Sequence, residues 1–289
     1  QWVWIEVPNT VFTTATSSSD YDKIKANLIT YAGAYREGKK GQNCNWIDEW
    51  YNGCGLTQEQ YTEKYQKMLG SIYTNKGFYI GRYEAGIDGS DENANLLRTS
   101  RTEITSATPR AVSKPDMIPY NYINCSDAEK LAEGMTVEGK TVSLMFGIQW
   151  DLTLKFIEEN NGKTKSLIKE DSTTWGNYQN ATFTIYKGSY SVDDGKNYTA
   201  VSQNYTKTNV ISDTTDSNVL ITTGATIRNC ALNIYDLAGN VFEFTLEQTT
   251  DGSNPCTIRG GYSGISGSVF SAYSRQSKDR SGSYENCGF

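Results

Sequence analysis

The six cysteines are the residues of this 289-residue chain with the widest range of chemistry. They lie at positions 44, 54, 125, 230, 256 and 287, and none forms the Cys-x-x-Cys pair that is typical of zinc sites. Their even number permits disulfides, but the sequence does not determine the pairing. Cys44 and Cys54 are close enough in the chain to close a loop, and the alternative is that both are free, partly buried thiols.

The sequence contains no histidine, which removes the most common general base and the Ser-His and Cys-His nucleophile pairs. Carboxylates remain as candidates. Glu84 and Asp88 could act as an acid and base pair, although we favour a surface or salt-bridged role. Asp236 and Asn240 could supply oxygen ligands to calcium, although we favour a turn stabilised by side-chain hydrogen bonds.

The composition argues against two classes of partner. The formal net charge is −6, and Lys and Arg gather only in the short run at 36–40, so we expect no nucleic-acid binding. No stretch of about 18 apolar residues occurs, so we expect no insertion into a membrane.

The apolar pattern and the capping residues predict a mixture of helices and strands. Helices are expected at 21–35, 57–72, 126–133 and 148–159, and strands at 2–14, at 77–84 and on both sides of a turn at 238–240. Because no clean linker or internal repeat occurs, we predict one domain over residues 1–289, with insertions at 17–75 and 160–229. The chain begins at Gln1 within an expected strand, so we expect it to be the C-terminal part of a longer protein.

Several motifs, in order along the chain, resemble those of the formylglycine-generating-enzyme (sulfatase-modifying factor) family. They are WVWI at 2–5, FYIGRYE at 78–84, PYNYINCSDA at 119–128, QWD at 149–151, NIYDLAGNVFEF at 233–244, RGG at 259–261 and GF at 288–289. The resemblance implies an α+β, C-type-lectin-like fold with small twisted antiparallel sheets, two main helices and long loop insertions. It also implies that Trp150, Phe242 and Phe244 belong to the core.

The enzymes of this family use two cysteines between the Arg-Gly-Gly strand and the Gly-Phe-Arg end. This chain has no cysteine at 260–286, and Cys256 and Cys287 only flank that stretch. We therefore expect no catalysis and no cofactor, with calcium as the one metal that the family brings into consideration.

The tail at 259–289 has a narrower resemblance to the variable region of ligand-binding proteins that retroelements diversify in phages and bacteria. In those proteins, randomised AAC codons yield Tyr, Ser, Gly, Ile, Val, Phe or Asp, and such residues crowd this tail. The resemblance implies an exposed ligand-binding face, for which the candidates are Tyr262, Ser263, Gly264, Ile265, Val269, Phe270, Tyr273, Ser274 and Tyr284. Arg259, Gly260, Gly261 and Arg275 are expected to be fixed scaffold residues.

These resemblances predict a non-catalytic module that binds a protein or glycan of a host-cell surface. The module would be attached to a larger parent protein or virion assembly, on a phage tail, a virion or a bacterial cell surface. The alternatives are a divergent formylglycine-generating-type oxidase and a structural decoration domain of a virion.

Overall fold

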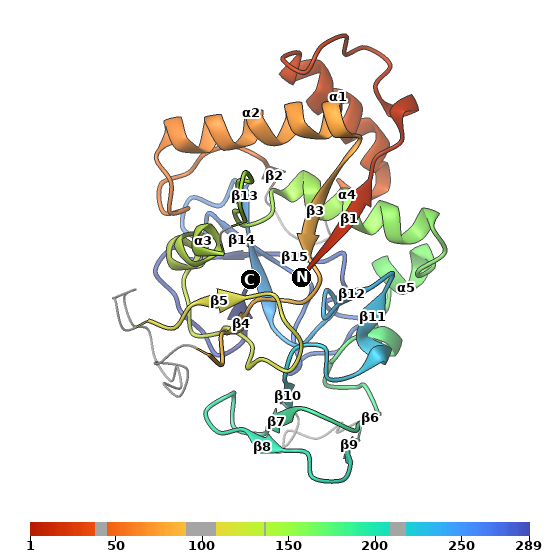
Figure 1. Ribbon diagram of the computed structural model, residues 1–289, viewed down its shortest axis with the longest axis vertical. Coiled ribbons are helices and arrows are strands. Elements are labelled where there is room, and N and C mark those ends of the chain that lie inside the picture. Colours follow the sequence, from red (N-terminus) through yellow and green to blue (C-terminus); the bar gives the residue numbers. More distant parts are fainter. Residues whose placement is uncertain (38–44, 91–107, 136, 209–217) are drawn as a thin grey trace.

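Helices cover one end of the molecule, and short strands joined by long loops fill the rest (Figure 1). The computed structural model describes residues 1–37, 45–90, 108–135, 137–208 and 218–289. The α-helices in these ranges are α1 (Tyr21–Ala32), α2 (Gln58–Asn75), α3 (Cys125–Gly134), α4 (Gly147–Glu159) and α5 (Lys165–Lys169). Short 3₁₀ helices occupy Asn9–Val11, Gly33–Tyr35, Thr173–Trp175 and Ile227–Asn229. None of the helices in the described part is both long and apolar enough to cross a membrane.

The strands are short, and most of them pair antiparallel. In the first half they are β1 (Trp2–Glu6), β2 (Trp46–Ile47), β3 (Gly77–Gly81), β4 (Gly86–Ile87) and β5 (Ala111–Val112). The segment 160–229 contributes β6 (Phe183–Ile185), β7 (Ser189–Ser191), β8 (Thr199–Ala200), β9 (Tyr205–Lys207) and β10 (Leu220–Ile221). The remainder are β11 (Cys230–Ala231), β12 (Ile234–Tyr235), β13 (Phe242–Thr249), β14 (Cys256–Arg259), β15 (Arg275–Lys278) and β16 (Cys287–Gly288). The prediction of a mixed α+β protein with small antiparallel sheets is confirmed.

The largest sheet has the order β15-β14-β13-β16, and β2 pairs with the far end of β13. Its strands are antiparallel except for β13 and β16, which run parallel. The 15-residue range 260–274 joins β14 to β15, and Arg259 and Arg275 stand opposite each other where this connection leaves the sheet. We call the β14–β15 pair the stem and residues 260–274 the loop.

Local capping explains where the helices begin. A capping box opens α2 at Thr57, where the sequence predicts a helix start, because the Thr57 hydroxyl accepts from Gln60 N and the Gln60 side chain accepts from Thr57 N. The next helix was predicted from Ser126, but Asn124 is its cap and accepts from Asp127 N at 2.9 Å, so α3 begins one residue earlier. The N-terminus of α4 is capped by a residue that is distant in the sequence, because Gly147 N donates a hydrogen bond to Asp48 Oδ1 at 2.6 Å.

Two of the strand predictions differ from the structure in length or in pairing. The strand expected at 2–14 ends at Glu6, because Pro8 leads into a 3₁₀ helix. The turn in the 233–244 motif is present, with Gly239 and Asn240 at φ +76° and +66°. Its flanking strands do not pair with each other, since β12 pairs with β11 and β13 pairs with β14.

The expectation of two main helices is incomplete. Four helices in the described ranges have ten residues or more, and α1 and α2 both lie in the segment expected to be an insertion. Their apolar faces bury Ile24, Leu28, Leu69 and Ile72 in the same core cluster as Trp150 and Phe244. Residues 17–75 therefore contribute to the core, because an amphipathic helix of this length needs an apolar surface to cover.

Candidate functional site

Two arginines are among the largest fully buried side chains in the described part of the chain. Arg259 and Arg275, at the end of the stem, are almost inaccessible to solvent, as are their partners Asp151 on α4 and Glu247 on β13. The Nη2 atoms of Arg259 and Arg275 lie 2.9 and 2.6 Å from Asp151 carboxylate oxygens. Arg259 Nη1 and Arg275 Nε lie 3.2 and 3.0 Å from Glu247 Oε2.

Arg36 and Asp48 complete this cluster, which we call the ion network. Arg36 Nη1 lies 2.9 Å from Asp151, 3.2 Å from Glu247 and 3.4 Å from Asp48. Three arginines therefore face three carboxylates, so no net charge is buried. Burial alone would raise the pKa of Asp151, but Arg275, Arg259 and Arg36 outweigh it and hold that pKa below its ordinary value.

The loop leaves the stem through two glycines that no other residue could replace without strain. Gly260 and Gly261 have φ +87° and +80°. A Cβ on Gly261 would lie 2.3 Å from the carbonyl oxygen of Phe270, across the base of the loop. A Cβ on Gly260 would lie 3.0 Å from the carbonyl oxygen of Leu237. The two glycines therefore allow the backbone to approach closely at the base of the loop.

Six of the nine predicted display residues reach the surface at least in part. Val269 is the most exposed of the large apolar residues among them, at 45%. The partly exposed residues are Tyr262, Gly264, Ile265, Phe270 and Tyr284. Phe242 supports this face from below, since its ring centroid lies 5.1 Å from that of Tyr262 and 5.6 Å from that of Phe270.

The other three predicted display residues, Ser263, Tyr273 and Ser274, are buried. Ser263 N donates to Asn240 O at 3.0 Å, which holds the residue against the 238–240 turn. The Tyr273 ring packs edge-on against Tyr35 at 6.2 Å, and Ser274 N donates to Ser271 O. Tyr273 and Ser274 lie inward because the loop closes onto the ion network before it joins β15, whereas the Ser263 hydroxyl donates to Asn218.

The segment 160–229 holds the outer part of the loop, which the sequence did not predict. Gln179 N donates to Ile265 O at 2.9 Å, and Gly267 N donates to Asn180 Oδ1 at 3.2 Å. Ser172 N donates to Gly267 O at 3.1 Å. These bonds fix the loop backbone between its exposed side chains, so the exposed residues stand on an ordered support.

Tyr284 lies outside the loop, in the turn between β15 and β16. Its hydroxyl donates to Asp279 Oδ2 at 2.6 Å, and Lys278 Nζ lies 3.5 Å from the centre of its ring. The hydrogen bond to Asp279 is the first cause that raises the pKa of Tyr284 to about 12. Tyr284 is therefore a neutral, oriented side chain beside Lys278, at the end of the stem away from the loop.

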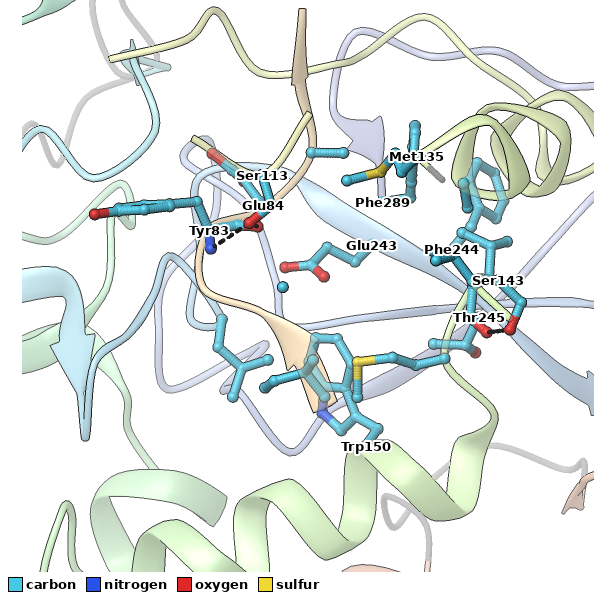
Figure 2. Close-up of a pocket in the computed structure, with 18 of the residues that line it drawn as sticks. Tyr83, Glu84, Ser113, Met135, Ser143, Trp150, Glu243, Phe244, Thr245 and Phe289 are labelled. Carbon is cyan, nitrogen blue, oxygen red and sulfur yellow. Dashed lines mark hydrogen bonds between the residues drawn. The ribbon is translucent and has the colours of Figure 1, made fainter. Parts of the chain in front are cut away.

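A second feature is a cavity of about 90 Å³ behind β13, lined by apolar side chains and two acidic ones. Figure 2 shows the Glu243 carboxyl group directed into this cavity, with Glu84 on one side and Trp150 on the other. Glu84 Oε1 accepts from Asn240 Nδ2, while the buried Oε2 has no hydrogen-bond partner among the residues that the structure describes. Burial and then the Asp236 charge raise the pKa of Glu243 to about 8.

Asp236 and Asn240 do not fit the calcium site considered from the sequence. Asn240 Oδ1 already accepts from Asn177 Nδ2 at 2.8 Å and from Ile221 N at 3.1 Å. Asp236 Oδ2 accepts from Gly224 N, and burial raises the pKa of Asp236 to about 7. In the ranges that the structure describes, no three Asp, Glu, Cys or His residues lie together as a metal site would need.

Glu84 and Asp88, which were considered as an acid and base pair, lie in different environments. Asp88 forms ion pairs with Arg110 at 3.2 Å and Lys114 at 3.7 Å, as the salt-bridged alternative predicts. Glu84 is buried at 4% exposure and is bonded to the neutral side chain of Asn240, so the expectation of a surface or salt-bridged role was wrong for this residue. The strand expected at 77–84 ends at Gly81, and Glu84 lies in the segment that follows β3, against the 238–240 turn.

The cysteines that flank the tail are buried. Cys256 begins β14 and Cys287 begins β16, and these two strands lie on opposite sides of β13. Both are free thiols, as is Cys54, while Cys44 lies outside the described residues. Neither flanking thiol faces a surface where a peptide substrate could reach it.

Comparison of the sequence with protein-family models and with curated protein sequences finds no match. The assignment of a function therefore depends on the geometry of the loop, the stem and the cavity.

Proposed function

We propose that this chain is a non-catalytic binding module with a C-type-lectin-like fold of the formylglycine-generating-enzyme type. Its ligand-binding face consists of the exposed side chains of the loop together with Tyr284. The observation that carries the proposal is the combination of a stem locked by buried ion pairs with a loop whose outer side chains reach the surface, Val269 at 45% and Tyr262, Ile265 and Phe270 in part. A rigid support with replaceable contact residues is what a binding surface requires.

The chemistry of the face favours a protein ligand. Ile265, Val269 and Phe270 present aliphatic and aromatic area to solvent, and Tyr262 adds a hydroxyl group. Apolar area rimmed by polar groups is typical of protein interfaces, whereas glycan sites need more hydrogen-bonding side chains. We propose a protein on a host-cell surface as the ligand, with a surface glycan as the alternative outcome. The module would sit on a phage tail, a virion or a bacterial cell surface as part of a larger assembly.

The buried thiols argue against the oxidase alternative, because Cys256 and Cys287 are inaccessible and lie on separate strands. We expect no aldehyde product when the protein is incubated with copper and a cysteine-containing sulfatase peptide, as read by mass spectrometry. Formation of that product would contradict the non-catalytic assignment. No contact in the structure favours a purely structural decoration role.

The binding proposal is tested with labelled protein on a panel of bacterial cells, some treated with protease and others with glycosidases. The variant Val269→Asp places a charge on the face at an exposed position, and Tyr186→Asp is the matched control on a residue that is 73% exposed, directly after β6 and outside the loop. We expect Val269→Asp to lose at least about tenfold in affinity and Tyr186→Asp to bind like the wild type. Equal binding by all three proteins would contradict the loop as the binding face.

A further inference from the structure

Two carboxyl groups of the cavity behind β13 present oxygen atoms that no described residue engages. Glu84 is 4% exposed, and its Oε2 atom has no hydrogen-bond partner among the described residues. Glu243 lies on β13, between β14 and β16, and its carboxyl group makes no hydrogen bond or ion pair within the described ranges. Figure 2 shows this carboxyl group pointing into the cavity, on the side where Glu84 lies. Because a buried acceptor normally finds a donor, the two groups indicate a ligand that supplies donors.

The wall of the cavity offers these acids no counter-charge. None of the described residues that line it is a lysine or an arginine. The hydroxyl groups of two serines on the wall are already engaged, since Ser113 Oγ donates to Tyr83 O at 3.0 Å and Ser143 Oγ donates to Leu144 O at 2.9 Å. Two acidic acceptors without a neighbouring cation therefore favour a ligand that is positively charged.

Most of the remaining wall is apolar, which decides what kind of cation fits. Leu144, Trp150 and Phe244 line the cavity, and the Trp150 indole nitrogen is occupied because it donates to Ala272 O at 3.1 Å. A hard metal ion needs a shell of about six or more oxygen ligands, which this wall does not offer. A primary ammonium group has N–H donors for the two carboxyl groups, and an alkyl chain attached to it would cover the apolar wall.

The size of the cavity limits the length of that chain. A water molecule needs about 10–15 Å³, so the cavity of about 90 Å³ has room for on the order of six groups of that size. Butylammonium is a cation of this size. Trp2, Met135 and Val142 also line the cavity and are partly exposed, so the cavity reaches the surface near these residues.

We propose that the cavity binds a small primary alkylammonium ion. The ammonium group lies between the carboxyl groups of Glu84 and Glu243, and the alkyl chain lies against Trp150 and Phe244. The site is separate from the loop, and the proposal does not rest on the proposed binding function of the loop.

The test is a calorimetric titration of the full chain with butylammonium chloride at pH 8. Butanol has the same alkyl chain without the charge, and tetramethylammonium chloride has the charge without an N–H donor. We expect butylammonium to bind at least about tenfold more tightly than either of these compounds. Equal affinities for the three compounds, or no binding of butylammonium up to about 100 mM, would overturn the proposal.

The two carboxyl groups are tested with Glu84→Gln and Glu243→Gln, which keep the shape of each side chain and remove its charge. We expect each variant to bind butylammonium at least about tenfold more weakly than the wild type. The matched control is Glu63→Gln on α2, whose exposed carboxyl group pairs with Lys67, and it should bind like the wild type. Wild-type affinity in both cavity variants would rule out the site.

A third variant fills the cavity and leaves both acids in place. Ala132 on α3 is 3% exposed and lines the cavity, so Ala132→Leu adds its extra carbon atoms to the space that the alkyl chain would occupy. We expect this variant to keep its Tm within a few degrees and to lose at least about tenfold in affinity for butylammonium. If Ala132→Leu binds butylammonium as the wild type does, the ligand lies elsewhere.

The acids also predict how the affinity depends on pH. Burial, followed by the Asp236 charge, raises the pKa of Glu243 to about 8, and burial is the first cause that raises the pKa of Glu84. The titratable neighbours are Asp236, whose pKa is raised to about 7, and the hydroxyl groups of Tyr83 and Tyr235, whose pKa values are raised from 10. Because the ammonium ion displaces a proton from the carboxyl groups to solvent, the affinity for butylammonium should rise at least about fivefold from pH 6 to pH 8. An affinity that stays constant or falls over this range would contradict a site formed by these acids.

Discussion

At the scale of single residues, the ion network is the feature with the largest energetic consequence. A buried ion pair adds little stability over an apolar replacement, but the loss of one partner leaves a buried charge without compensation. Asp151 receives contacts from three arginines, so its removal would leave the greatest imbalance. The network therefore fixes the geometry of the stem more than it adds to total stability.

We expect Asp151→Asn to lower the free energy of unfolding by about 3–5 kcal/mol, because the side chain keeps its shape but no longer neutralises Arg259 and Arg275. Urea denaturation measures the change. The control is Glu63→Gln, which removes an exposed pair with Lys67 and should leave the transition midpoint unchanged. An unchanged midpoint for Asp151→Asn would mean that the network is not formed.

The raised pKa of Glu243 in the cavity predicts that the protein loses stability as the pH rises. Its pKa is raised from 4.5 to about 8, so the folded state keeps a proton that the unfolded state has already lost. This contribution to stability is complete below about pH 4.5 and disappears as the pH rises through about 8.

We expect Glu243→Gln, which stays neutral, to lose less stability than the wild type between about pH 5 and pH 8, as read from Tm. Lys207, whose pKa is lowered to about 7 by burial, contributes with the opposite sign above that pH but is present in both proteins. Parallel Tm curves for the two proteins would show that Glu243 titrates normally.

At the scale of elements, the stem and the loop have different sensitivities. The stem is closely packed, and so are Gly260 and Gly261 at the base of the loop. The rest of the loop has an inner row of side chains that face the core and an outer row that reaches the surface. Tyr273 belongs to the inner row and Val269 to the outer row. Position within one short segment therefore separates residues required for folding from residues available for binding.

We expect Tyr273→Ala to lower the free energy of unfolding by about 3–5 kcal/mol, since it empties a packed site beside Tyr35. Val269→Ala should change it by less than about 1 kcal/mol, because that side chain is exposed. Thermal and chemical denaturation of the two variants provide the comparison. Unfolding of the Val269→Ala protein would place Val269 in the core and remove the proposed face.

At the scale of the whole molecule, the sequence predicted elements whose signals are local. The capping box at Thr57 located α2, and the Gly239-Asn240 turn followed from residue type alone. The burial of Tyr273 could not be predicted, because the Gly- and Ser-rich tail has no periodicity that separates inside from outside. The burial of Glu247 was not predicted for a different reason. It lies at a position of β13 where the alternation of apolar and polar residues indicates exposure, and only the arginines that are distant in the sequence bury it.

The central claim, that the outer loop residues serve binding and not folding, is tested most directly by randomising them. One displayed library varies Tyr262, Gly264, Ile265, Val269, Phe270 and Tyr284, and a matched library varies Arg259, Ser263, Tyr273, Ser274 and Arg275. The measurement is the fraction of clones in each library that resist protease and can be enriched on an immobilised, unrelated globular protein. We predict that most clones of the first library stay folded and yield binders, while few clones of the second stay folded. Similar folded fractions in the two libraries, or a lower fraction in the first, would contradict the account.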